Sequence, residues 1–293
     1  MTRCLTKVVP LLILTMALSS AVAAQDGSSP AFTPVPELSS GFHLLYGQDF
    51  PEARAKFIEW ESQHPEEPFG EVAIAASYLF EEFYRQGVLT SDFFLNEKRF
   101  LNGIDGKPDP ERMKSFEDAI HEARTLAKQR LEKNSHDAEA LFALTLAAGM
   151  ESNSRLVLRK QHMESLKRLK EANEYAKQLL VEQPDADDAY VAVGSANYII
   201  GSLSGGARFM LWFGGIHGDK KLGMQQLTKT IENGRYLQPF AKILLALAAR
   251  REKQNELAVK LLKELCDEYP DSPLYAAEYA KAQGKLIPAE VHP

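Results

Sequence analysis

A spacing of apolar and small residues that recurs along the chain is the feature that most restricts its fold. Ala53, Phe57, Trp60 and Pro65 are separated by four, three and five positions. The same spacing returns in residues 172–184, 227–239 and 258–270 and, without the final proline, in 123–135. Ten positions after each copy stands a small residue: Ala75, Thr145, Gly194, Ala249 and Ala280. Steps of four and three align side chains on one helix face, a proline stops the next helix from continuing the first, and a small residue permits close crossing. The pattern therefore predicts a series of helical hairpins.

The rest of the chain favours helices as well. Apolar residues recur at three and four positions, and no alternating β-branched run is bounded by hairpin dipeptides. Asp109-Pro110 and Ser272-Pro273 each place a capping side chain before a proline in a first helical turn. We therefore predict an all-α protein.

The repeated spacing resembles that of the tetratricopeptide repeat (TPR) family. The resemblance rests on Gly41 with Ala53, Phe57 and Pro65, and on residues 184–194 and 255–280. It implies a helical-hairpin repeat solenoid, a TPR-like superhelix over residues 38–286, followed by a tail at 287–293. It also implies a concave inner surface lined by the first helix of each pair, and a role as a scaffold in larger assemblies rather than as an enzyme.

Departures from the regular period indicate insertions. Successive copies end at residues 65, 135, 184, 239 and 270, whereas TPR units repeat at about 34 residues. The longer gaps predict insertions near residues 88–109, 150–165 and 201–221. Insertions in such arrays tend to lie on one face, which is often the binding face.

The amino terminus has the layout of a secretory signal peptide. Arg3 and Lys7 precede an apolar run at residues 8–18, and small residues follow it. The run is shorter than the roughly 20 residues that a membrane-spanning helix needs. We expect residues 1–24 to be a signal peptide and 25–37 a disordered linker, so the mature protein would be extracytoplasmic or periplasmic and soluble. Because Cys4 precedes the apolar run, a lipoprotein is not expected.

Charge and cysteine content narrow the function classes. The formal net charge is −6, which gives no general reason to expect nucleic acid as a partner. Cys266 would be the one cysteine left in the mature chain, which excludes an intramolecular disulfide. The histidines are scattered and lack zinc-binding spacing, and no nucleophile stands beside a base in a familiar pattern. We therefore expect no metal, no cofactor and no enzymatic activity.

The glycine-rich segment 201–221 contains a first set of candidate partner-binding residues, Phe209, Trp212 and Phe213. A phosphate loop is not expected, because Lys221 is followed by Leu222 rather than by Ser or Thr. In one interpretation the aromatic cluster packs into a hairpin crossing. In the other it forms an exposed apolar patch that meets a partner or a lipid surface.

A basic segment contains a second set, Arg155, Arg159 and Lys160, continued by Lys167, Arg168 and Lys170. Charge runs are usually solvated helix faces, and the alternative is a contact for an acidic partner or anionic head groups.

These features predict a non-enzymatic scaffold or adaptor in the bacterial cell envelope that binds a peptide or partner protein on a concave surface. Glu71, Tyr78, Asn197 and Lys242 are the expected inner-face residues. The alternatives are a periplasmic binding protein for a small apolar ligand, in which the aromatic cluster lines a cavity, and an accessory subunit of an envelope transport or assembly complex. A peripheral membrane contact is compatible with each of these functions.

Overall fold

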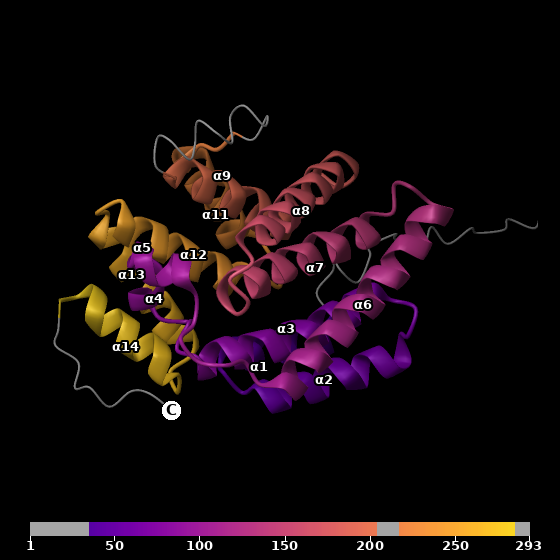
Figure 1. Ribbon diagram of the computed structural model, residues 1–293, viewed down its shortest axis with the longest axis horizontal. Helices are drawn as coiled ribbons and strands as arrows, with labels where there is room; N and C mark the ends of the chain where they lie inside the picture. Colours follow the sequence, from indigo (N-terminus) through magenta and orange to yellow (C-terminus); the bar gives the residue numbers. More distant parts are fainter. Residues whose placement is uncertain (1–34, 204–216, 285–293) are drawn as a thin grey trace, which may run out of the picture.

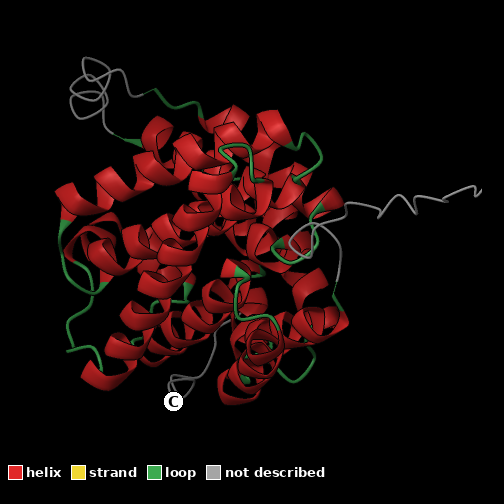
Figure 2. Cartoon of the chain, turned by 90° about the vertical axis from the view of Figure 1, so that its right-hand side faces the viewer, coloured by secondary structure: helices red, strands yellow, loops and turns green. Residues whose placement is uncertain are grey.

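The computed structural model describes residues 35–203 and 217–284 of the chain. Within these residues all regular structure is helical (Figure 2), so the all-α prediction is confirmed. The helices are α1 Pro36–Tyr46, α2 Phe50–Gln63, α3 Pro68–Arg85, α4 Ser91–Leu95, α5 Glu97–Asn102, α6 Pro110–Lys133, α7 Ala138–Val157, α8 His162–Glu182, the 3-10 helix η1 Asp187–Ala189, α9 Tyr190–Ser202, α11 Lys220–Asn233, α12 Gln238–Arg251, α13 Asn255–Glu268 and α14 Pro273–Ala282.

Capping side chains and prolines set where several helices begin. Asp109 Oδ1 accepts from the backbone N–H of Arg112 at 2.8 Å, and Ser272 Oγ accepts from that of Tyr275 at 3.3 Å, as the sequence predicts. A proline in the first turn also starts α1, at Pro36. The first helix therefore begins inside the segment 25–37 that the composition assigns to a linker, and Leu38 is already buried.

Successive helices pack in pairs: α1 with α2, α3 with α6, α7 with α8, α9 with α11, and α12 with α13, with α14 at the end (Figure 1). The pairs form two layers. Most side chains that face the middle of the molecule come from α1, α3, α7, α9, α12 and α14, whereas α2, α6, α8, α11 and α13 lie outside them.

The recurring positions of the sequence form the contacts between the layers. Their buried members include Ala53, Phe57, Trp60, Ala123, Ala127, Ala172, Ala176, Leu179, Leu227, Ala258, Leu262 and Leu265. In the copy at 123–135 the third position is Arg130, which is ion-paired to Asp137 at 2.9 Å and to Glu139 at 2.7 Å. An ion-pair cluster therefore replaces the apolar contact there.

The two ends of the array meet. The hydroxyl oxygen of Tyr236, just before α12, accepts from the backbone N–H of Val35 at 2.9 Å, and its ring lies 5.1 Å from that of Phe42 in α1. The ring of His43 stacks on that of Tyr269 at 4.9 Å between centroids. The helix pairs thus close on themselves rather than forming an open superhelix.

In the segment between α3 and α6, α4 packs on α12 and α5 packs on α7, and Figure 1 shows both short helices over α12 and α13. Asp92 of α4 is ion-paired to Lys281 of α14 at 2.7 Å, and the N–H of Ile104 donates to the carbonyl oxygen of Val157 at 3.0 Å. Gly103 has a φ of 67°, and a Cβ there would lie 2.4 Å from that same oxygen, so only glycine fits. Residues 88–109, where the spacing predicts an insertion, contain α4 and α5.

The other two expected insertions differ in what the structure describes. The one near 150–165 covers the end of α7 and the start of α8. The one at 201–221 lies mostly outside the described residues. Among the helices of residues 35–203 and 217–284, none is both long and apolar enough to cross a membrane.

Candidate ligand-binding cavity

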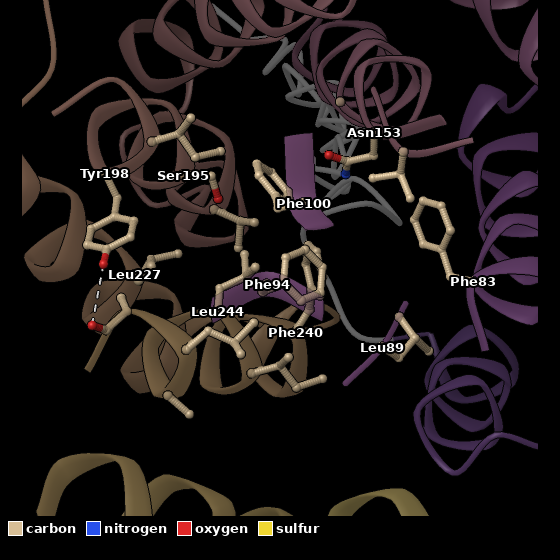
Figure 3. A pocket seen from close by; sticks show the side chains of 18 of the residues that line it. Phe83, Leu89, Phe94, Phe100, Asn153, Ser195, Tyr198, Leu227, Phe240 and Leu244 are labelled. Carbon is tan, nitrogen blue, oxygen red and sulfur yellow. Dashed lines mark hydrogen bonds between the residues drawn. The ribbon is translucent and has the colours of Figure 1, made fainter. Parts of the chain in front are cut away.

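A cavity of about 340 Å³ occupies the middle of the molecule, and we call it the central cavity (Figure 3). It has the size of a small-molecule site, which is typically about 300–1,000 Å³. Its wall is mostly aliphatic and aromatic, and its main contributors are Leu79, Phe80, Phe83, Phe94, Phe100, Leu146, Leu156, Val191, Phe240, Ile243, Leu244 and Leu247.

Several inner helices supply this wall through residues three or four positions apart. In α12 they are Phe240, Ile243, Leu244 and Leu247. In α9 they begin with Val191 and include Ser195, Tyr198 and Ser202. Residues with this spacing share one helix face, so the inner helices need a second apolar face besides the one that packs on their outer partners. That requirement explains why α7 and α12 are apolar over most of their circumference.

Aromatic side chains divide the cavity. The rings of Phe80 and Phe240 meet edge to face at 5.5 Å between centroids, and those of Phe94 and Phe100 lie 5.8 Å apart. Figure 3 shows Phe94, Phe100 and Phe240 between one wall with Tyr198 and an opposite wall with Phe83. Because Phe94 and Phe100 belong to α4 and α5, the insertion forms part of the wall.

Several polar groups in the wall bond to the protein itself. Thr145 Oγ1 donates to the carbonyl oxygen of Leu141 at 2.8 Å, and the hydroxyl groups of Ser152 and Ser165 lie 3.0 Å apart. The Tyr198 hydroxyl lies 3.3 Å from a carboxylate oxygen of Glu252; burial first, and this charge second, raise the pKa of Tyr198 to about 12. With their bonds made internally, these groups leave the lining predominantly apolar.

One edge of the cavity is charged. Arg250 is ion-paired to Glu278 at 3.5 Å and hydrogen-bonded to the hydroxyl of Ser91, which ties α12 to α4. Glu278 also pairs with Lys281 at 3.0 Å, and its side chain is only 7% exposed. The cavity thus combines an apolar body with one ionic edge, an arrangement that suits an amphipathic molecule.

The sequence-predicted site residues lie elsewhere. Phe209, Trp212 and Phe213 fall outside the described residues. Arg155 lies on the side of α7 opposite the central cavity. Arg159 and Lys160 are exposed in the turn before α8, where Lys160 has a φ of 57°.

None of the four expected inner-face residues lines the central cavity. The ring of Tyr78 lies under the guanidinium of Arg54 at 3.9 Å, and Asn197 Nδ2 donates to Gln226 at 2.8 Å. Lys242 is paired to Glu268 at 3.2 Å, and Glu71 is half-buried. These four residues lie on inner helices, as expected, but their side chains are not on the helix faces that line the central cavity. These inner helices have two apolar stripes, and the sequence does not show which stripe packs on the outer helix. The second stripe itself, for example Phe80 and Phe83 in α3, was a readable signal for the cavity.

No protein-family model matches the chain, and no curated protein matches it significantly.

Within the described residues, no group of three or more His, Cys, Asp or Glu side chains is placed to hold a metal ion. Cys266 is half-buried, and burial raises the pKa of its thiol.

Proposed function

We propose that this chain is a binding protein of TPR-like repeat architecture that holds a small apolar or amphipathic molecule in the central cavity. The observation that carries the proposal is the cavity of about 340 Å³ whose wall is built from aliphatic and aromatic side chains of all six inner helices. Removing an apolar molecule from water into such a wall is favourable by roughly 25 cal/mol per Å² of buried apolar surface. The charged edge at Arg250 and Glu278 would hold a polar end of the ligand.

A small ligand fits this site better than a peptide on a concave surface. The space that an open TPR superhelix offers to a peptide is here covered by α4 and α5, which are tied to α12, α14 and α7. A peptide would have to displace them, together with the buried ring of Phe93, whereas a small molecule needs no such displacement. Taken with the export predicted from residues 1–24, the proposal describes a ligand carrier of the cell envelope.

Filling the cavity tests the proposal. Gly149 lines the central cavity, and a Cβ added there meets no atom within 4 Å. Gly149→Leu therefore places an aliphatic group in the space proposed for the ligand. We expect the neutral apolar dye N-phenyl-1-naphthylamine to bind the wild type saturably and the variant at least about tenfold more weakly, because its burial is lost. The measurement is a fluorescence titration.

Ala276→Leu is the matched control, because Ala276 is exposed on α14 and does not line the cavity. It adds a larger aliphatic group without touching the site, so its dye affinity should equal that of the wild type. Equal affinities of the wild type and Gly149→Leu, with both folded by circular dichroism, would show that the dye binds elsewhere and would reject the proposal.

A further inference from the structure

A second cavity, of about 330 Å³, lies on the other side of α7, where α6 and α8 flank that helix (Figure 1). Its floor includes the buried side chains of Phe116 and Ile120, and its walls carry four arginines, Arg124, Arg155, Arg159 and Arg168. We call it the arginine pocket. It shares no lining residue with the central cavity, so it is a separate site.

Two of the four guanidinium groups are held in place by carboxylates. Arg124 Nη1 lies 2.9 Å from Glu151 Oε2, and its Nη2 bonds to Glu171. Arg168 Nη1 bonds to Glu171 at 2.5 Å. Burial alone would raise the pKa of Glu171, but the bonds from Arg124 and Arg168 lower it below its ordinary value. These guanidinium groups are therefore fixed at the wall before any ligand arrives.

The other two guanidinium groups keep donors for a ligand. Arg155 lies 3.6 Å from Glu151 and donates to Gln161 at 3.2 Å, but its buried Nε–H has no hydrogen-bond partner among residues 35–203 and 217–284. Arg159 pairs with Glu117 at the rim, where their side chains are 38% and 49% exposed. An ion pair this exposed contributes little to stability and exchanges readily.

We infer that the arginine pocket binds an oxyanion with at least two negative charges, of the phosphate-ester or pyrophosphate class. Guanidinium forks match phosphate oxygens in pairs, and fixed forks lose little freedom on binding. Four guanidinium groups here face the carboxylates of Glu117, Glu151 and Glu171. A fourth carboxylate, Glu164, lies near Arg155 and Arg168 but is paired to Lys167 at 2.7 Å, so an incoming anion compensates the remaining positive charge. It takes the place of the Glu117 carboxylate beside Arg159 and accepts from Arg155 Nε–H.

The first test is calorimetric titration of the mature protein with inorganic pyrophosphate at fixed ionic strength. We expect saturable binding by the wild type and at least about tenfold weaker binding by the double variant Arg155→Gln/Arg159→Gln, since charge-assisted bonds are lost. The matched control is Lys160→Gln/Lys170→Gln, which removes the same charge from exposed neighbouring residues outside the pocket lining. Its affinity should stay within about threefold of the wild type, because general charge attraction alone is weak.

The variant Glu117→Gln distinguishes a phosphate-binding site from an ion-pair network that only stabilises the fold. Removing the carboxylate that competes for Arg159 should strengthen pyrophosphate binding several-fold, whereas a structural role predicts no gain. Absence of saturable heat with the wild type, or equal losses in the arginine and lysine double variants, would overturn the inference.

Flotation with phosphatidylcholine vesicles containing phosphatidic acid identifies the source of the phosphate group. Flotation that is lost in the arginine variant and kept in the lysine variant assigns it to a lipid head group. Pyrophosphate binding without flotation assigns it to a soluble phosphate compound. Either result supports the pocket as a phosphate site, and neither depends on the central cavity.

Discussion

Individual acidic residues in this protein are stabilised to very different degrees by their surroundings. Asp188 is 5% exposed and accepts from the backbone N–H groups of Arg235 at 3.1 Å, Tyr236 at 3.1 Å and Leu237 at 3.0 Å. Burial raises the pKa of Asp188, and these three bonds oppose the rise. Asp188 thus binds the loop before α12.

Glu71 in α3 is the contrasting case. Burial first, then the charges of Glu61 and Glu122, raise its pKa from the ordinary value of 4.5 to about 7. A carboxyl whose pKa is higher in the folded chain than in the unfolded chain contributes stability that is complete below pH 4.5 and is lost as the pH rises through about 7. At pH values above about 7, the ionised Glu71 side chain lowers the free energy of unfolding.

Glu71→Gln should therefore raise the free energy of unfolding at pH 8 and change it little near pH 4.5. We expect a gain of about 1 kcal/mol at pH 8, well below the full linkage value because the half-buried side chain is partly screened by water. Urea unfolding of the wild type and Glu71→Gln at the two pH values measures this change in the free energy of unfolding. Glu66→Gln, at an exposed position in the preceding loop, is the control. A gain of equal size at both pH values, or in both variants, contradicts the assignment to Glu71.

At the scale of elements, helix crossings depend on glycines that bring two backbones close. A Cβ at Gly223 of α11 would lie 2.6 Å from the backbone nitrogen of Tyr198 and 2.7 Å from the carbonyl oxygen of Gly194, both in α9. The neighbours are backbone atoms, which cannot turn away as a flexible side chain does. The predicted role of Gly194 as a small crossing residue is therefore shared with Gly223.

Gly223→Ala should destabilise the protein by about 1–3 kcal/mol, because α9 and α11 must separate to admit the methyl group. Gly149→Ala is the matched comparison, since it also lies within a helix but its added Cβ meets nothing within 4 Å. That variant should gain about 0.5–1 kcal/mol from helix propensity. Thermal unfolding of the two variants measures both stability changes. If Gly223→Ala and Gly149→Ala change the stability in the same direction, close backbone packing at Gly223 is not the cause.

For the whole molecule, closure of the array makes its two ends depend on each other. In an open solenoid each repeat contacts only its neighbours, so a change near the last repeats leaves the first helix unaffected. Here Tyr236 contacts Val35 and Phe42, two hundred positions away in the sequence. Its ring also lies 5.3 Å from that of Phe69 in α3.

Tyr236→Ala should cost about 3–5 kcal/mol and speed amide hydrogen exchange in α1 as well as around its own loop, because one side chain supports both. Hydrogen exchange followed by mass spectrometry locates the effect. Phe116→Ala removes another buried ring, in α6, away from this contact, and its exchange should rise first in α6 and α7. If α1 keeps its wild-type exchange in Tyr236→Ala, the ends are not coupled.

The amino-acid sequence by itself determined the helical class, the serial helix pairs and several helix starts. These follow from interactions within a few residues. Steps of three and four select one helix face, as at Ala53, Phe57 and Trp60, and a capping side chain such as Asp109 needs only the next turn. The same local spacing predicts insertions near residues 88–109, 150–165 and 201–221, and the first of these stretches contains α4 and α5.

The tertiary structure alone decided which apolar face surrounds the central cavity, that α4 and α5 form part of its wall, and that Arg124 joins Arg155 and Arg159 at one pocket. Each of these three features depends on contacts between residues far apart in the chain. The small rotations between successive helix pairs add up and determine which distant residues meet. Helical periodicity says that Phe83 and Phe240 are apolar positions. Only the closing of the array brings both side chains to the same cavity, where Phe240 lies between the wall with Phe83 and the wall with Tyr198.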